Sequence, residues 1–415
     1  MLSFDEARAK MLALVSTLGP ERVGLDEAMG RVLAEAVTAP TDAPAFDYSA
    51  MDGYAVSAVQ WPASDPIRLP LRGESRAGSS PASLVPGSAC RIFTGAPIPH
   101  GADAIVMQED VEISGDAVVF KGRPTPGAHI RRQGEDLARG AMAIATGTRL
   151  RPSHISLAAS CDRSWLLVAR RPIVSIIGTG DELRPPGSLD LFDHAGGEAA
   201  GRAVRAGLIP ESNAAAVRAM AMRAGAHARV LPFAKDDRAA MKTAFEEAIR
   251  GSDLLVTIGG VSVGDHDLVR PVLLELGARI DFWKVKVKPG KPLLVGVRGD
   301  ALVLGLPGNP SSALVTFALF GVPLLRAMQG DLRAITKPMK ARASRDIPHS
   351  PGRLDFVRVT VAREGGLVAT PLDNQASGAA TSMADADALA CIEEQRGAVR
   401  AGEDVDILWL DELGA

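Results

Sequence analysis

The chain has 415 residues, too many for one hydrophobic core, so we expect roughly two to four domains. Hydrophobic residues make up 47% and charged residues 23%, which is ordinary for a globular protein. The 46 Lys and Arg residues against 49 Asp and Glu residues leave a net charge of -3, which argues against a general nucleic-acid coat or a polybasic membrane surface. Any anion site must therefore be local.

The three cysteines, Cys90, Cys161 and Cys391, are far apart and odd in number. They indicate neither a disulfide framework nor a Cys-x-x-Cys metal site, so a reducing compartment is the simplest interpretation. The N-terminal stretch is acidic and amphipathic, and no apolar run approaches the roughly 18 residues of a membrane span. We expect a cytoplasmic protein without a membrane or nucleic-acid partner.

Residues 3–38 predict two helices, the second beginning after Gly19-Pro20. From about residue 40 to about 140, short apolar runs cut by turns predict a mainly β domain. A helix followed by a strand is predicted over 151–171.

Residues 172–328 alternate between near-continuous β-branched runs and helical patterns. Strands that are apolar on both faces imply a parallel sheet covered by helices. We predict an α/β multidomain protein with a central parallel-sheet domain at 171–328 and a mainly β domain at 40–139. A helical linker domain at 1–39 plus 140–170 and a small C-terminal β domain at 329–415 complete the predicted organisation.

Ligands of open α/β sheets bind at the carboxyl ends of the strands. Four turns with unusual composition follow strands of the predicted sheet: 179–182, 236–237, 259–267 and 307–312. A single glycine-rich turn is usually only a turn, but four at one sheet edge favour a ligand site. In the last turn, Asn309 is the expected N-cap and Pro310 the first helical residue, which would leave backbone N–H groups facing an anion.

The turn that begins at Gly259 delivers Asp265, His266 and Asp267, although carboxylates should repel phosphate. The P-loop and dinucleotide fingerprints are missing from the sequence. Carboxylates beside a phosphate site are reasonable if Mg²⁺ lies between them, and Asp236, Asp265 and Asp267 are the candidates. The alternative is that these aspartates only complement helix dipoles.

Lys284, Lys286 and Lys288 fall on one face if their segment is extended, with Val285 and Val287 on the other. Three ammonium groups in a row repel one another, so we expect an oxyanion, or the carboxylates of Asp236 and Asp267, to lie among them. The alternative is a solvated edge strand guarded by lysines.

In the β domain, Arg131 and Arg132 are interpreted as a paired anion clamp near four carboxylates. These are Asp47, Asp52, Glu135 and Asp136.

Seven motifs in order, "SAMDGYA", "TGAPIPHGADAIVMQED", "RRQGEDL", "GTGDEL", "TIGGVSVGDHD", "FWKVKVKPGKP" and "LGLPGNPSSALVTF", together resemble the molybdopterin molybdenumtransferase family. These molybdenum-insertion enzymes of cofactor biosynthesis are related to the C-terminal part of gephyrin. The resemblance spans nearly the whole chain and is highly specific.

The resemblance implies a homodimer with sites shared between subunits. It also implies that molybdate is inserted into adenylylated molybdopterin with Mg²⁺-dependent release of AMP. A molybdopterin adenylyltransferase and molybdoenzymes would be possible partners. A non-catalytic molybdopterin-binding or scaffold protein on the same fold is the alternative, although a scaffold has no need of the full set of carboxylates and lysines.

The resemblance also implies site residues. The implied catalytic positions are Asp52, Thr94, Asp136, Glu182, Asp267, Lys284 and Lys288. The implied substrate- and cofactor-binding positions are Gly259, Gly260, Ser262, Gly264, Ser212, Asn213, Pro307, Gly308, Pro310, Arg353 and Ser377. The implied metal ligands are Asp236, Asp267 and Glu182.

Three departures from the family pattern concern substrate detail. Tyr48 replaces the usual Asn, Glu211 replaces the usual Asp, and an extra run rich in Gly and Ala lies at 187–206.

Overall fold

The computed structural model describes residues 1–62, 66–188, 207–261 and 267–415. Contacts divide the chain into two compact units. Unit 1 comprises Met1–Ala34, Gly147–Arg151 and Leu166–Ala415, and unit 2 comprises Glu35–Thr146 and Pro152–Trp165. The finer division into four domains stays a prediction, and most of the extra run, 189–206, lies outside the described residues.

The N-terminal segment forms one helix, not two. Helix α1 (Phe4–Leu12) begins with a capping box in which Ser3 and Glu6 each bond the other's backbone N–H, so the first predicted helix is confirmed. The second is wrong, because strand β1 (Pro20–Gly24) pairs with β12 (Trp165–Ala169) and turns follow it. Pro and Gly residues interrupt this stretch and leave no continuous helical run.

The central sheet of unit 1 has six strands in the order β16 (His227–Val230), β13 (Ile173–Gly178), β17 (Leu254–Ile258), β21 (Ala301–Leu306), β20 (Leu294–Arg298) and β18 (Arg279–Phe282). The first four are parallel, and the last two run antiparallel to their neighbours. Every residue of β17 and β21 is buried. The predicted parallel sheet is therefore confirmed, with an antiparallel edge added.

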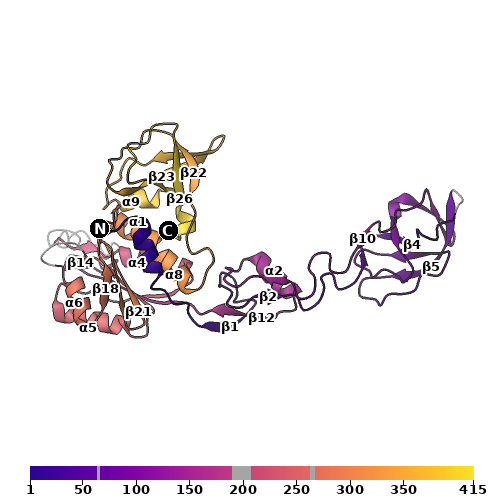
Figure 1. Cartoon of the computed structure of the whole chain (residues 1–415), viewed down its shortest axis with the longest axis horizontal. Helices are drawn as coiled ribbons and strands as arrows, with labels where there is room; N and C mark the ends of the chain where they lie inside the picture. The colour runs from indigo at the N-terminus through magenta and orange to yellow at the C-terminus, as the bar shows by residue number, and fades with distance from the viewer. Residues whose placement is uncertain (63–65, 189–206, 262–266) are drawn as a thin grey trace, which may run out of the picture. The chain divides into compact units, whose positions relative to one another are not determined.

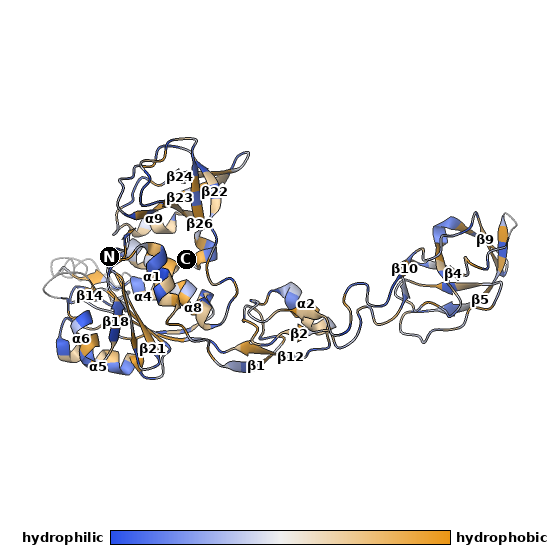
Figure 2. Ribbon diagram, viewed as in Figure 1, coloured by the Kyte–Doolittle hydropathy of each residue, from blue (hydrophilic) through white to orange (hydrophobic). Residues whose placement is uncertain are grey.

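Helices cover both faces of this sheet (Figure 1). One face packs against α1, α4 (Asn213–Arg223), α7 (Pro310–Thr316) and α8 (Val322–Met328), and the other packs against α5 (Arg238–Ile249) and α6 (Val269–Glu275). Figure 2 shows hydrophobic residues on the strands and hydrophilic ones on the outer sides of α5 and α6. Among the described helices, only the continuous stretch Pro310–Met328 has the length and apolarity of a membrane span, and 83% of it is buried inside the protein, as in a core helix.

The C-terminal part of unit 1 is a small barrel. Its sheet order is β19 (Val287–Lys288), β23 (Leu354–Arg363), β24 (Leu367–Pro371), β22 (Met339–Ala343), β26 (Asp404–Trp409) and β25 (Ala388–Ile392), and β25 also pairs with β23. Two short helices, α9 (Ala380–Ala384) and α10 (Leu410–Leu413), accompany it. The first strand comes from the lysine segment, so the α/β sheet and the barrel are joined through that segment.

One hydrophobic core runs through the sheet, α1 and the barrel. The ring of Phe4 meets Phe320 of the helical layer and Phe356 of the barrel, each at 5.3 Å between ring centroids. Edge-on aromatic contacts of this kind add to the burial energy. The relative placement of sheet and barrel is thus fixed by packing.

Unit 2 is mainly β, as predicted. Its sheet order is β7 (Ala104–Met107), β4 (Gly53–Val56), β6 (Ala89–Ile92), β5 (Ile67–Ser75), β9 (Ala117–Phe120) and β8 (Val111–Ser114). Strand β3 (Tyr48–Ser49) pairs with β10 (Ile130–Arg131), and β2 (Val37–Thr38) with β11 (Met142–Ile144). Helix α2 (Pro152–Ser160) and β12 confirm the helix and strand predicted over 151–171.

Candidate active site

The carboxyl ends of β13, β17 and β21 meet at one edge of the central sheet. Gly259 and Gly260, with φ of 96° and 59°, turn the chain sharply after β17. A Cβ on Gly259 would lie 2.6 Å from the carbonyl oxygen of Thr179, and one on Gly260 would lie 2.5 Å from Cγ2 of Val269. Only glycine fits these positions, so the turn is built for close backbone approach.

The turn after β21 lies against the same place. Asn213, the first residue of α4, donates from Nδ2 to the carbonyl oxygen of Gly308 at 2.7 Å. A Cβ on Gly308 would lie 3.5 Å from Cα of Gly259, so the two turns are in contact. The Oδ1 atom of Asn213 is buried and accepts no hydrogen bond from the described residues. The structure thus brings three predicted substrate-binding residues together, and their roles stay predictions.

The predicted metal ligands differ in exposure. Glu182 and Asp236 are exposed, whereas both carboxylate oxygens of Asp267 are buried. The Glu182 carboxylate lies against the backbone of Gly180, and the Asp236 N–H donates to Oδ1 of Asp181 at 3.2 Å.

Within the described parts of the chain, no three His, Cys, Asp or Glu side chains gather as a metal cluster. Ser262, Gly264, Asp265 and His266 lie outside the described residues.

Glu211, one of the three departures from the family pattern, has a structural role. Its Oε1 accepts from the N–H of Ala214 at 2.9 Å, in the first turn of α4. The residue at the N-cap position, Ser212, is exposed and makes no side-chain capping bond. Glu211 therefore caps the helix that carries Asn213.

The start of α7 contacts the barrel, which corrects the prediction of free N–H groups at its first turn. Asn309 occupies the N-cap position, but its side chain makes no capping bond; its Nδ2 donates to Oγ of Ser377 at 3.0 Å. The N–H of Ser311 donates to the carbonyl oxygen of Ser377 at 3.0 Å. The segment that carries Ser377 lies over the helix start and uses the donor that would otherwise face an anion.

The prediction that the valines of the lysine segment face inward is confirmed. Val285 and Val287 are 0% and 1% exposed. Only Val287–Lys288 forms a regular strand, while Val285 makes an isolated bridge to Leu2.

The predicted partners of the lysines, Asp236 and Asp267, are wrong for the two lysines whose ion pairs are seen. Lys286 Nζ lies 2.7 Å from Oε1 of Glu394, and Lys288 Nζ lies 3.1 Å from Oδ2 of Asp355. Both carboxylates belong to the barrel, because β19 is a barrel strand. The third lysine lies with Nζ 4.3 Å from the ring centroid of Trp283, a cation–π contact made by Lys284.

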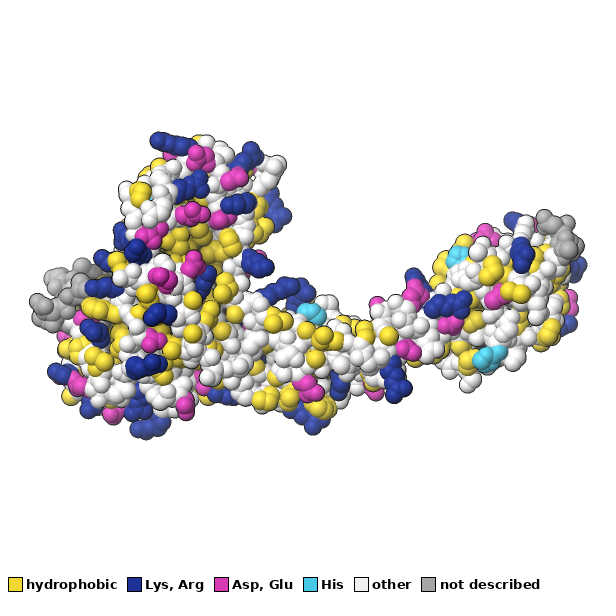
Figure 3. All heavy atoms as spheres, viewed as in Figure 1, with side chains coloured by type: hydrophobic (Ala, Val, Ile, Leu, Met, Phe, Trp, Pro, Cys, Tyr) yellow, Lys and Arg dark blue, Asp and Glu magenta, His cyan; other side chains and the backbone are white. Residues whose placement is uncertain are grey.

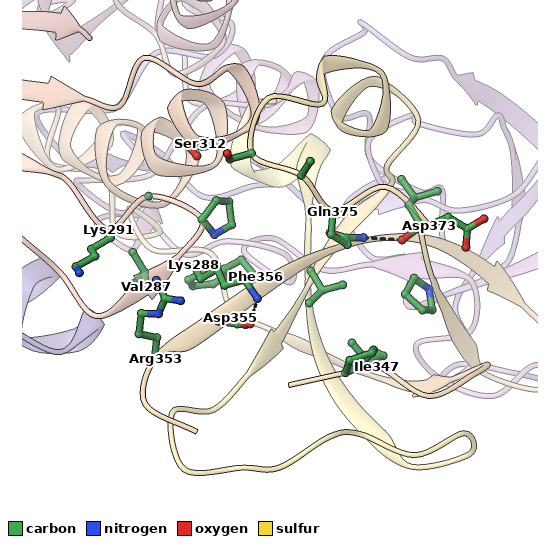
Figure 4. A pocket seen from close by; sticks show the side chains of 18 of the residues that line it. Val287, Lys288, Lys291, Ser312, Ile347, Arg353, Asp355, Phe356, Asp373 and Gln375 are labelled. Atoms are coloured by element: carbon green, nitrogen blue, oxygen red, sulfur yellow. Dashed lines mark hydrogen bonds and ion pairs between the residues drawn. The ribbon is translucent and has the colours of Figure 1, made fainter. Parts of the chain in front are cut away.

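A pocket of about 800 Å³ lies between the end of the lysine segment, α7 and the barrel (Figure 4). Its charged lining consists of Lys288, Lys291, Arg345, Arg353, Asp346, Asp355 and Asp373. Four basic and three acidic side chains leave one excess positive charge. Figure 4 shows Lys291, Lys288 and Arg353 at one end and Asp373 and Gln375 at the other.

The acidic residues of the pocket are already paired. Asp355 binds Lys288, Asp373 binds Arg345, and Asp346 binds Arg400. Lys291 and Arg353, in contrast, form no ion pair with any residue that the structure describes. Ser312 and Ser377 also line the pocket, and the two cations make their end of it suited to an oxyanion.

The sequence did not point to the residues that hold Arg353 in place. The buried ring of His349 lies with Nε2 3.0 Å from the carbonyl oxygen of Arg353 and Nδ1 2.7 Å from that of Arg396. The carboxylate of Asp355 lies 3.9 Å from the same ring. The alternation of side chains along the strand that begins in "GRLDF" could have predicted that Asp355 faces inward. No pattern in the sequence around His349 predicts its position.

In unit 2, Asp52 and Thr94 form a joined pair. The N–H and the hydroxyl of Thr94 both donate to Oδ1 of Asp52 at 2.7 Å. These bonds lower the pKa of Asp52 below its ordinary value, so the carboxylate stays ionised. Asp136 is exposed, and its N–H donates to the carbonyl oxygen of Ala43 at 3.1 Å.

The prediction that Arg131 and Arg132 form an anion clamp is wrong, because both guanidinium groups are already paired with carboxylates. Arg131 pairs with Glu135 at 2.9 Å, and Arg132 pairs with Asp47 at 2.6 Å. Tyr48 is opposite Arg131 in the β3–β10 pairing. Over the visible face of the molecule, basic and acidic side chains are intermingled in the same way (Figure 3).

Family comparisons cover nearly the whole chain. Residues 2–161 match the MoeA N-terminal region (domains I and II), 175–327 match a probable molybdopterin binding domain, and 340–410 match the MoeA C-terminal region (domain IV).

Individual relatives agree with the family matches. A molybdopterin molybdenumtransferase of Haemophilus influenzae is 35% identical over 98% of both chains, and one of Bacillus subtilis is 35% identical over 98% of this chain and 94% of its own. The crystal structure of a molybdopterin biosynthesis MoeA protein from Pyrococcus horikoshii OT3 matches with a TM-score of 0.84 and 28% identity, covering 99% of this chain and 100% of its own. The chain therefore belongs to the molybdopterin molybdenumtransferase (MoeA) family.

Proposed function

We propose that the protein is a transferase that inserts molybdate into adenylylated molybdopterin, releases AMP and yields molybdenum cofactor. The observation that carries the proposal is the cationic end of the pocket, where Lys291 and Arg353 have no carboxylate partner among the described residues. Through Asn309 and Ser377, this pocket adjoins the glycine-rich sheet edge. One region suits an oxyanion and the other suits a phosphate-bearing organic substrate.

The roles of the residues follow from their chemistry. Lys288, Lys291 and Arg353 attract and orient molybdate, with Arg353 offering a planar fork of N–H donors. The glycines at 259, 260 and 308 let the two turns pack closely at the sheet edge, which brings their backbone N–H groups to the place where the phosphates would bind.

The chemistry of the predicted donors suits Mg²⁺, although the three side chains do not gather into one cluster among the described residues. The predicted ligands, Glu182, Asp236 and Asp267, offer only carboxylate oxygen, and the buried carboxylate of Asp267 suits a hard cation. When bound, Mg²⁺ would neutralise phosphate charge and assist departure of AMP. The protein's own part is to hold these carboxylates at the edge where the phosphates are expected.

The finer predictions on assembly and location belong to the same proposal. A homodimer with shared sites would give Asp52, Thr94 and Asp136 of unit 2 a role at the sheet edge of a second copy. The protein would act in the cytoplasm, receive its substrate from a molybdopterin adenylyltransferase and deliver product to molybdoenzymes.

The deciding experiment is reconstitution of the full-length protein with adenylylated molybdopterin, Mg²⁺ and molybdate, followed by AMP release. We expect molybdate-dependent AMP release that is strongly reduced in the Arg353→Ala variant. Tight substrate binding without AMP release would overturn the proposal in favour of a non-catalytic binding protein.

A further inference from the structure

Arg358, in the middle of β23, is among the most completely buried side chains of the protein, with 1% of its surface exposed. Its Nη2 donates to the carbonyl oxygens of Asn374 at 3.2 Å and Ala376 at 3.1 Å, and its Nε donates to Oε1 of Gln375 at 3.3 Å. The guanidinium group is thus enclosed by one short loop, residues 374–376.

The charge of Arg358 has no counterpart nearby. It forms no ion pair with the described residues, and its Nη1 is buried without a hydrogen-bond partner among them. Burial lowers the pKa of the Arg358 guanidinium from its ordinary value, but an arginine side chain is not deprotonated in proteins, so the group stays charged. A buried cation without a counterion is unfavourable unless another charge offsets it.

The loop that encloses Arg358 is also a wall of the pocket. Gln375, Ala376 and the following Ser377 all line it. Gln375 is held from both sides, since its Oε1 accepts from the N–H of Arg358 at 3.0 Å and its Nε2 donates to the carbonyl oxygen of Arg358 at 2.9 Å. The guanidinium therefore lies one residue layer behind the pocket surface.

We propose that Arg358 is a positioning residue and the buried counter-charge of the oxyanion that binds in this pocket. It holds the 374–377 loop in place, and a bound dianion offsets its charge. The inference rests on the proposed function, since it requires the pocket to take molybdate or a similar dianion.

A buried charge differs from a surface charge in its response to salt. Dissolved ions screen exposed groups effectively at high ionic strength but screen buried groups much less. The contribution of Arg358 to anion affinity should persist in high salt, whereas that of the exposed Lys291 should fade.

The test measures the molybdate dissociation constant by calorimetry at about 0.05 M and about 0.5 M NaCl, together with thermal stability. Arg358→Met removes the charge at similar length, and Arg358→Lys keeps the charge but loses the planar fork. Arg31→Met is the matched control, because Arg31 is buried, pairs with Glu21 and is not part of the pocket lining.

We expect Arg358→Met to weaken molybdate binding about tenfold at both salt concentrations, and Arg358→Lys to recover most of that loss. In turnover, the KM for molybdate should rise more than kcat falls. Arg31→Met should lower thermal stability and leave the dissociation constant unchanged. If Arg358→Met does not fold, Arg358→Gln replaces it with the same expectation.

The inference is overturned if folded Arg358→Met or Arg358→Gln binds molybdate like the parent protein, or if the loss disappears in high salt. The proposed function fails separately, if the parent binds no molybdate or if Arg353→Ala binds it equally well. Loss of binding in Arg353→Ala together with normal binding in Arg358→Met would reject only the role of Arg358.

Discussion

The sheet edge and the barrel pocket, which adjoin through Asn309 and Ser377, are built in different ways. At the sheet edge, Gly259 and Gly308 let two turns pack closely against each other, and the nearby carboxylates differ in burial. The pocket is lined by long charged side chains. Their positions depend on ion pairs between the lysine segment and the barrel, such as that of Lys288 with Asp355. The edge should therefore be sensitive to changes in size or charge at a few positions, while the pocket should respond gradually as cations are removed.

The largest effect is expected at the sheet edge. Asp267→Asn should reduce AMP release by roughly a hundredfold or more, because the proposed metal–phosphate site would lose a charged group, while the fold is retained. The measurement is AMP release across Mg²⁺ concentrations, with circular dichroism as the folding control. Unchanged turnover at saturating Mg²⁺ would show that Asp267 does not serve the metal.

A smaller effect is expected in the pocket. Lys288→Ala should raise the KM for molybdate about tenfold, because one of several cations is lost from the lining. Lys286→Ala is the control, since Lys286 pairs with Glu394 and is not part of the lining. The family motif also places function on Lys284, so Lys284→Ala should raise the KM for molybdate more than Lys286→Ala does. Equal behaviour of all three variants would place the anion site elsewhere.

A substitution at the opposite end of the central sheet should change the stability of the protein without changing its activity. Asp253, just before β17, accepts from Nη1 and Nη2 of Arg170 at 2.7 and 2.6 Å. Asp253→Asn should lower the free energy of unfolding by about 1 kcal/mol and leave the KM for molybdate unchanged.

The pH dependence of that loss has a defined sign. Burial pushes the pKa of Asp253 up, but the bonds from Arg170 and the N–H of Ile173 outweigh it, so the pKa lies below its ordinary value of 3.8. The stabilisation is complete above 3.8 and is lost as the pH falls through the lower, folded-state pKa. Denaturant unfolding at several pH values should show the parent and the variant converging in acid. A gap that widens in acid would contradict this assignment.

The smallest effect is expected at Glu211. Glu211→Asp restores the usual family residue and should change stability by less than about 0.5 kcal/mol, because a shorter carboxylate can still cap α4. Glu211→Ala should lose about 1 kcal/mol, since the N–H of Ala214 loses its partner. A strong loss of AMP release in Glu211→Asp, measured with normal stability, would show that the longer side chain serves the substrate.

The sequence predicted the sheet edge better than the pocket for a physical reason. The turns at Gly259 and Gly308 follow buried strands directly, and parallel strands bring such turns together at one edge. The pairing of Lys288 with Asp355 joins residues whose proximity depends on β19 entering the barrel, and alternation along the chain does not report strand partners. Asp236 and Asp267 lie in the same domain as the lysines, whereas Glu394 and Asp355, the carboxylates that pair with Lys286 and Lys288, belong to the barrel.

The second predicted helix failed for a related reason. Its apolar spacing is compatible with a helix, but β1 finds a partner in β12, far along the chain. Long-range pairing therefore overrode local periodicity at both places.

The position of α1 has a consequence for the order in which the chain folds. Phe4 is among the first residues synthesised, yet its ring partners, Phe320 and Phe356, are made when most of the chain is complete. The helix cannot reach its native packing until then, and a single amphipathic helix of 9 residues is marginal in water on its own. During translation the buried side chains of α1, Phe4, Ala7 and Met11, therefore remain without their native partners until the barrel strand that carries Phe356 has been made.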